Sequence, residues 1–232
     1  MSEQITIEVP AEYIAVLKLF AAQADLRNYL NGIAVEIGPV ESRIVATDGA
    51  RLGCFRVKSE QPAVTEPLTD ICIPNHLLQH VKTKGRVSIT VGAQIKHIDE
   101  KGEDANTLSR PVAIRYDGIV VTGNSFDATY VDFRRVFPES TVSFKPAHYN
   151  AGYVGDLAKA WKLLHPKETC CAAILQNGDD NSKSARDYAA LIDLCCPDFA
   201  GVIMPQQLKN HSSVTPGWVF DTLAAADAAD LL

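Results

Sequence analysis

The chain has 232 residues and a mass of 25.2 kDa, with 22 Lys and Arg against 28 Asp and Glu, which gives a formal charge of −6. With 47% hydrophobic and 22% charged residues it lies outside the disordered class, and at this length it can fold around its own core. The acidic balance disfavours a protein that coats nucleic acid by charge alone, but a local basic surface stays open.

The amino terminus carries no basic start followed by an apolar stretch, and the sequence has no run of 18 apolar residues. We therefore expect a cytoplasmic protein with no membrane partner. Six cysteines in such a chain predict reduced thiols rather than a disulfide framework.

The first supersecondary unit begins with a strand at 5–9, where apolar and polar residues alternate. Pro10 can begin a helix, and apolar residues at three- and four-residue spacing predict one from 11 to about 25. Three strands follow, separated by turn signals at Gly38-Pro39 and Asp48-Gly49. They are predicted at 32–36, 43–46 and 53–57.

The same order of elements occurs twice more, each time with Pro at the junction between strand and helix. The second unit is predicted as a strand at 70–73, a helix from 75 to about 84, and strands at 86–91, 94–98, 114–116 and 118–122, with a polar loop at 100–109. The third is predicted as a strand at 142–145, a helix from 147 to about 164, and strands at 171–175, 188–194 and 199–204. Such repeats predict an α+β fold of three β-α-β-β-β units that share a continuous sheet, with the odd third unit needing a partner.

Four segments carry a resemblance to a known family: Tyr29-Leu-Asn-Gly32, Ile44-Val-Ala-Thr-Asp-Gly-Ala-Arg-Leu52, Val131-Asp-Phe-Arg-Arg-Val-Phe-Pro138 and Val202-Ile-Met-Pro205. Together, and in this order over about residues 5–208, they resemble the bacterial replicative sliding clamp, the beta subunit of the replicative DNA polymerase. The resemblance implies the DNA-clamp fold and a protein that is not an enzyme and holds no cofactor.

The chain departs from the family in its length. A full member has three domains of two units each and closes as a head-to-tail dimer. This chain resembles the middle domain, at 1–138, joined to half of the last domain, at 139–208, and followed by a tail at 209–232. Four such chains would supply the twelve units of the family's ring, so we expect a homo-oligomer.

In the family, an apolar pocket between the middle and last domains receives short linear motifs of DNA polymerases and other clamp-binding proteins of replication and repair. Such a site needs a preformed apolar cleft for Leu or Phe anchors. The resemblance places eight residues around it: Leu30, Thr47, Gly49, Arg51, Leu52, Pro138, Val202 and Met204. Ala50 stands where the family has His, so partner preference is expected to differ. The alternative is that Gly49 only forms a turn with positive φ and that Pro138 only ends a strand.

A clamp also encircles duplex DNA and presents Lys and Arg from its helices to the phosphates without reading bases. The candidates here are Lys18, Lys82, Lys84, Arg86, Lys159 and Lys162, with Arg27 after the first helix. For Lys18 or Lys159 taken singly, a solvated helix face is the preferred interpretation. The cluster at 82–86 leaves both interpretations open.

The function that the resemblance implies is processivity or tethering, by binding linear motifs and encircling duplex DNA. The alternative is an adaptor or decoy that competes for clamp-binding peptides without DNA. The final Asp230-Leu231-Leu232 resembles a clamp-binding peptide, but an amphipathic helix that covers an exposed edge explains the tail more simply.

Three further patterns are weak candidates for metal sites. Asn177-Gly-Asp-Asp180 has the composition of a turn, although paired aspartates can bind Mg²⁺. Neighbouring cysteines at 170–171 and 195–196 point to opposite faces of a strand, so each pair can offer only one sulfur to a common zinc centre. His76 and His80 lack a third ligand at a recognisable spacing. We therefore predict no metal site and no catalytic residue.

Overall fold

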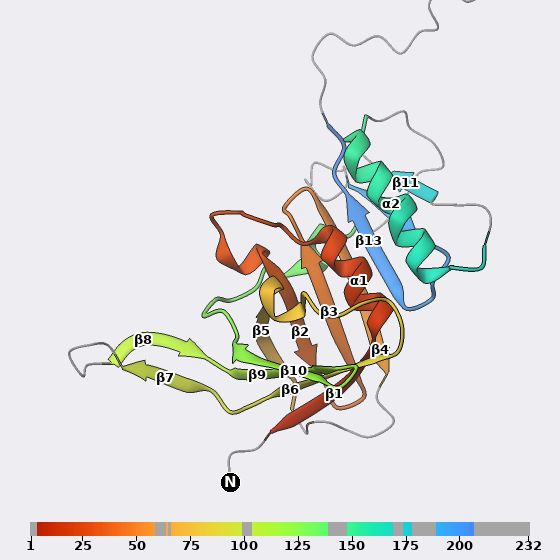
Figure 1. Ribbon diagram of the computed structural model, residues 1–232. Coiled ribbons are helices and arrows are strands. Elements are labelled where there is room, and N and C mark those ends of the chain that lie inside the picture. Colours follow the sequence, from red (N-terminus) through yellow and green to blue (C-terminus); the bar gives the residue numbers. More distant parts are fainter. Residues whose placement is uncertain are drawn as a thin grey trace, which may run out of the picture.

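The computed structural model describes residues 4–58, 64, 66–98, 104–138, 148–168, 174–177 and 189–206 (Figure 1). Its elements, in chain order, are β1 (Ile5–Pro10), α1 (Ala11–Phe20), η1 (Asn28–Leu30), β2 (Gly32–Ile37), β3 (Glu41–Thr47), β4 (Arg51–Lys58), β5 (Leu68–Pro74), η2 (Asn75–Leu78), β6 (Arg86–Val91), β7 (Ile95–Ile98), β8 (Asp104–Ser109), β9 (Pro111–Tyr116), β10 (Ile119–Asn124), η3 (Phe133–Val136), α2 (Ala151–Leu164), β11 (Ile174–Asn177), β12 (Ala190–Asp193) and β13 (Phe199–Ile203). The strand predicted at 142–145, Cys170, Cys171, Asp179, Asp180 and the tail at 209–232 lie outside the described residues.

The described strands form two large antiparallel sheets and one hairpin. The four-stranded sheet has the order β1-β6-β9-β10, and the seven-stranded sheet has the order β11-β12-β13-β4-β3-β2-β5. The first two units exchange their first strands. Strand β1 of the first unit pairs with β6 of the second, and β5 of the second unit pairs with β2 of the first. The first two units are therefore interlocked. The hairpin β7-β8 extends away from the four-stranded sheet (Figure 1).

The first and third units join edge to edge. Strand β13 pairs antiparallel with β4, and the register places Val202 opposite Leu52 and Phe199 opposite Phe55. Helices α1 and α2 lie next to each other on one face of the resulting sheet (Figure 1). The continuous sheet expected from the repeat is thus observed between these two units.

The main core fills the space between the helices and the sheets. Ile14, Leu17 and Phe20 of α1 are at most 1% exposed and belong to the same core as Ile44 and Phe55 of the sheet. The Tyr13 ring stacks on Phe55 with 4.0 Å between centroids. From α2 the core receives Leu157 and Trp161.

A second apolar cluster covers the opposite face of the seven-stranded sheet, and we call it the outer cluster. Because side chains alternate along a strand, Leu52 and Cys54 face away from the helices. The outer cluster contains Ala34, Val45, Leu52, Cys54, Phe133, Ala189 and Val202, with Tyr130, Val136, Phe137, Leu191 and Met204 packed against it. The segment around η3 is held onto β2 by two hydrogen bonds from Arg134 to the Glu36 carboxylate, at 2.6 and 3.0 Å.

Three of the predicted elements are wrong in extent. Helix α1 ends at Phe20 rather than near residue 25, because Ala21 is extended. The helix predicted over 75–84 is only the 3₁₀ turn η2, and the β-branched Val81 and Thr83 before Gly85 disfavour its continuation. The polar loop predicted at 100–109 is a strand from 104 onward, because β8 pairs with β7. Among the described residues, no helix combines the length and apolarity that a membrane crossing requires.

Candidate functional site

The turn between β3 and β4 is built by two side chains of its own sequence. The Thr47 hydroxyl donates to the Arg51 carbonyl at 2.6 Å and accepts from the Gly49 N–H at 3.0 Å. The Asp48 carboxylate accepts from the N–H groups of Ala50 and Arg51 at 2.9 and 3.0 Å. Gly49 has φ of +91°, a conformation that favours glycine. These hydrogen bonds all lie within the turn itself, so its shape does not depend on a contact with the third unit.

The end of β13 meets this turn. The Met204 N–H donates to the Ala50 carbonyl at 2.8 Å, one residue beyond the pairing of Ile203 with Arg51. The chain then continues alongside 148–150, where the Gln206 N–H donates to the His148 carbonyl at 2.7 Å. Two of the segments quoted for the family resemblance thus lie side by side, although they are far apart in the sequence.

Most of the predicted pocket residues gather at this junction. Leu52 and Val202 are 3% and 2% exposed and belong to the outer cluster, and the half-buried Met204 packs against them. Pro138 is half-buried and directly follows Phe137, which packs on the same cluster. Thr47 and Gly49 form the adjoining turn. Met204 is therefore partly accessible beside a buried apolar wall.

Leu30 does not belong to the outer cluster. It is 1% exposed at the end of η1, and its carbonyl accepts from the Ala22 N–H at 3.0 Å. Its neighbour Tyr29 approaches the cluster instead, because the Tyr29 and Tyr130 rings meet edge to face at 6.2 Å. Leu30 thus supports the region from η1 rather than lining the cluster.

The Arg51 guanidinium lies on the helix side of the sheet, away from the outer cluster. It pairs with Asp48 at 3.1 Å and with Asp156 of α2 at 2.9 Å, and it donates to the Leu19 carbonyl of α1 at 2.5 Å. It also stacks over the Tyr153 ring, 4.2 Å from the centroid. Arg51 is only 7% exposed and so ties β4 to both helices at the joint between the first and third units.

Asp156 is charged under this arrangement. Partial burial alone would raise its pKa, but hydrogen bonds from Lys159 and Arg51 outweigh burial, so the net pKa is lowered. The carboxylate therefore stays ionised at pH values below those at which an ordinary Asp becomes protonated. The ion pair between Arg51 and Asp156, together with the hydrogen bond from Arg51 to Leu19, therefore connects α1 and α2 through β4.

The sequence analysis missed the residues that cover the outer cluster. Phe133, Val136 and Phe137 all come from the segment at 131–138, of which only Pro138 was assigned to the pocket. Their three- and four-residue spacing was the available signal. Cys54 was also missed; burial raises the pKa of its thiol to about 12, so it contributes an apolar surface and no reactive thiolate.

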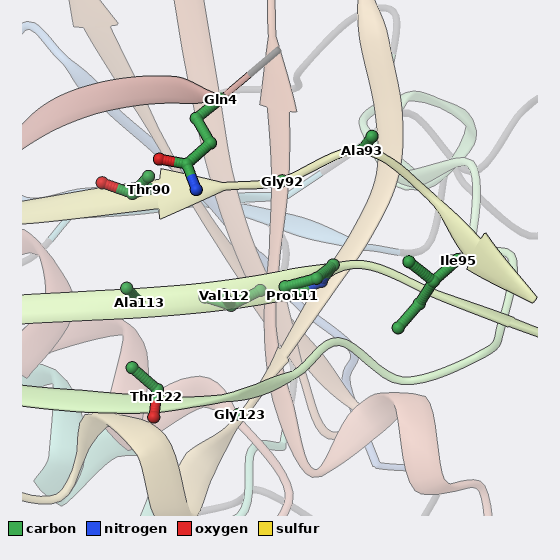
Figure 2. A pocket seen from close by; sticks show the side chains of 10 residues that line it. All are labelled: Gln4, Thr90, Gly92, Ala93, Ile95, Pro111, Val112, Ala113, Thr122 and Gly123. Carbon is green, nitrogen blue, oxygen red and sulfur yellow. The ribbon is translucent and has the colours of Figure 1, made fainter. Parts of the chain in front are cut away.

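Two hollows in the described surface lie away from Leu52 and Met204. A cavity of about 200 Å³ lies between β2, β5 and the segment Tyr130–Phe133, beside the outer cluster. A second, of about 290 Å³, lies on the four-stranded sheet, and Figure 2 shows Thr90, Ala113 and Thr122 on its strands with Gln4 above them. The small side chains on these three strands leave that sheet face hollow.

Lys18 differs from the other basic candidates because it is half-buried and its ammonium group bonds to two backbone carbonyls. It donates to the carbonyls of Leu78 and Val81 at 3.3 and 3.1 Å, and burial lowers its pKa. Lys18 thus satisfies two carbonyl groups in the segment that was predicted to be a helix. The turn after η2 consequently lies beside α1.

The other six basic candidates are exposed, and one of them, Arg27, pairs with Asp25 at 2.9 Å. Lys82, Lys84 and Arg86 lie between η2 and the start of β6, and Arg86 donates to the Glu8 carbonyl at 2.9 Å. On α2, Lys159 pairs with Asp156 at 2.8 Å and Lys162 donates to the Glu168 carbonyl at 2.9 Å. All six are accessible to a polyanion, and their contact with DNA stays a prediction.

No three potential metal ligands of the His, Cys, Asp or Glu types come together within the described ranges. His80 instead packs its ring edge against Tyr116, with 6.2 Å between centroids. Cys195 is exposed while its neighbour Cys196 is half-buried.

Solved structures share this fold. A Pseudomonas aeruginosa DNA polymerase sliding clamp with ligand is 15% identical with a TM-score of 0.60, covering 88% of this chain and 67% of that one. A Helicobacter pylori beta clamp bound to a DNA ligase peptide is 12% identical with a TM-score of 0.62, covering 90% of this chain and 67% of its own. The Caulobacter crescentus pol III beta is 16% identical with a TM-score of 0.58, covering 88% and 66%.

No protein-family model matches the sequence, and no curated protein matches it significantly. The structural similarity shows that the chain has the DNA sliding-clamp fold, which confirms the predicted fold class. The chain spans about two thirds of the length of these clamps. It therefore corresponds to a shortened form of the fold.

Proposed function

We propose that this protein is a clamp-like tethering factor, without catalytic activity of its own, that binds short linear motifs of replication and repair proteins. The observation that carries the proposal is the meeting of the Asp48–Arg51 turn with Met204, sealed by the Met204 to Ala50 hydrogen bond at 2.8 Å. This contact joins two units at an apolar surface, and such a surface acts by binding and not by catalysing a reaction.

The chemistry of the junction favours a peptide with apolar anchors. Leu52 and Val202 supply a buried apolar floor, the half-buried Met204 packs beside it, and the half-buried Pro138 follows Phe137 of the same cluster. Methionine adapts its shape to different ligands, and backbone groups of a turn fix the register of a bound chain. A peptide that ends in Leu-Phe offers two anchors for such a surface.

The comparison with solved clamps supports the same assignment. The H. pylori clamp that shares this fold was solved with a DNA ligase peptide bound. We infer that this chain takes peptides of the same kind. Because Ala50 stands where the family has His, the partner preference is expected to differ in detail.

Binding of a fluorescent peptide that ends in Leu-Phe tests the proposal by anisotropy. Met204→Asp places a charge at the rim and is expected to weaken binding at least about tenfold, whereas Met204→Leu keeps volume and polarity and should retain it. Val40→Asp is the matched control, because Val40 is 76% exposed in the turn between β2 and β3. Equal affinity of Met204→Asp and wild type, or no binding by folded wild type, would refute the peptide site.

Encirclement of duplex DNA is the second part of the proposed function. The exposed Lys82, Lys84, Arg86, Lys159 and Lys162 are the residues that would face phosphates. A closed ring should stay on circular DNA and be lost when the DNA is linearised, and a tethered partner would then gain local concentration. Peptide binding without such retention would favour the alternative, an adaptor or decoy that competes for clamp-binding peptides.

A further inference from the structure

Strand β10 is an exposed edge. It is the last strand of the second unit, and among the described strands only β9 pairs with it. Ile119 and Val120 are 49% and 52% exposed. The strand Ile-Val-Val-Thr-Gly-Asn contains neither Pro nor a charged residue, the usual features that protect an edge from pairing. The opposite edge of this sheet, β1, does carry Glu8 and Pro10.

The chain itself shows what covers an edge of this type. Strands β4 and β10 both follow an Asp-Gly turn, and Gly49 and Gly118 have φ of +91° and +77°. Both are the last strands of their units. The free side of β4 is covered by β13, the last strand of the third unit, in an antiparallel pairing. Units in this chain therefore join last strand to last strand.

We propose that β10 pairs antiparallel with β10 of a second copy of this chain. The last strands of the first and third units are already used against each other, so the free last strand that another copy offers is its own β10. Antiparallel pairing of two identical strands has two-fold symmetry and closes on itself. The inference deepens the proposed function by naming a contact through which chains would assemble around DNA.

A register centred on Val121 pairs five of the six residues of the strand, from 119 to 123. Val121 would then face its own copy, and Val120 would face Thr122 of the second copy. Gly123 would face Ile119 of the second copy, and a glycine leaves space for that side chain. The β4–β13 junction also contains glycines at paired positions, because Gly53 faces Gly201 there. Gly123 of β10 and Gly53 of β4 both face the helical elements. An added Cβ at Gly123 would meet Leu77 of η2, and one at Gly53 would meet Phe20 of α1.

The molar mass of the full chain at increasing concentration tests the contact. Wild type is expected to associate, and Val120→Lys should raise the dissociation constant at least about tenfold, because a lysine on an edge strand disfavours pairing and the two copies would bring two added positive charges close together. Val120 is half exposed, so the variant should fold normally. Val40→Lys, with the same change at a more exposed turn, should associate like wild type. A wild-type monomer, or association unaffected by Val120→Lys, would overturn the proposal.

The register has its own test. Under mild oxidation, Val121→Cys is expected to form a disulfide with its copy, since opposite residues of an antiparallel pair lie within disulfide reach. Ile119→Cys should not do so, and oxidised wild type reports any contribution of the native cysteines. A disulfide at 119 in place of 121 would overturn the two-fold register. A monomer whose β10 amides exchange slowly would identify a segment of the same chain as the occupant, which also overturns the proposal.

These results are separable from those of the peptide assay. The peptide site lies on the seven-stranded sheet and β10 lies on the other sheet. Val120→Lys should therefore bind the Leu-Phe peptide with wild-type affinity per chain, and Met204→Asp should associate like wild type. Failure of the wild-type chain in one assay but not in the other would refute only the corresponding assignment.

Discussion

Leu52 of β4 lies directly opposite Val202 of β13, so the outer cluster is completed only when the first and third units share one sheet. On the other face of the same junction, Arg51 of β4 pairs with Asp156 of α2 at 2.9 Å. The proposed peptide surface and the ion pair therefore depend on the same joint. A change that loosens the joint should affect both stability and peptide affinity.

Arg51→Ala is expected to lower the free energy of unfolding by about 3 kcal/mol, because it removes one partner of a buried ion pair. The loss includes two carboxylate contacts and the hydrogen bond to Leu19. Arg51→Lys keeps the charge but cannot form the same fork of hydrogen bonds, so its loss should be smaller. Urea unfolding measures both. A free energy for Arg51→Ala within about 0.5 kcal/mol of wild type would show that the joint does not depend on this residue.

Acid should weaken the same joint through Asp156. Its pKa is lowered in the folded protein, so the stabilisation is fully present above the unfolded pKa and is lost as the pH falls through the folded pKa. Asp156→Asn removes this dependence. The difference in stability between wild type and Asp156→Asn should therefore shrink from about pH 6 to about pH 2. A difference that stays constant over this range would contradict the charge assigned to Asp156.

The sequence predicted the strands well because their alternation reflects burial directly. Arg86–Val91 was predicted with its observed bounds, β1 to β5 and β9 are longer than predicted by one to three residues, and β7, β12 and β13 are shorter than predicted. The repeat also indicated that units would share a sheet. These features follow from local pattern, which a single sequence displays.

The errors arise from contacts between distant residues. Nothing near residue 78 indicates that Lys18 will bond to the carbonyls at 78 and 81, where a helix was predicted. In the same way, the direction of Arg51 depends on Asp156 in a helix of another unit. The family resemblance identified the junction, but the side of the sheet that each residue faces required the register of β4.

Two glycines provide opposite tests of packing. Gly155 lies exposed within α2 with no heavy atom within 4 Å of an added Cβ, so Gly155→Ala should stabilise the protein by about 0.5–1 kcal/mol. At Gly32 an added Cβ would press on the Ile73 carbonyl of the neighbouring strand. Gly32→Ala should therefore cost about 1–3 kcal/mol. Thermal unfolding of both variants checks the pair, and stabilisation by both would contradict the β2–β5 packing.

Lys18 and Lys84 separate a structural lysine from one available to DNA. Lys18→Met removes the donor to two backbone carbonyls while it keeps the apolar stem, so it should cost about 1–3 kcal/mol of stability. Lys84 is exposed, and Lys84→Met should change stability by less than about 0.5 kcal/mol.

DNA affinity should show the reverse order. If Lys84 faces a phosphate, Lys84→Met should reduce the slope of log affinity against log salt concentration by about 1, whereas Lys18→Met should leave the slope unchanged. Fluorescence anisotropy of labelled duplex at several salt concentrations measures the slopes, under conditions where both variants are fully folded. A slope reduced by Lys18→Met and not by Lys84→Met would reverse the two assignments, because an ammonium group held by backbone carbonyls would then be the one that releases counterions.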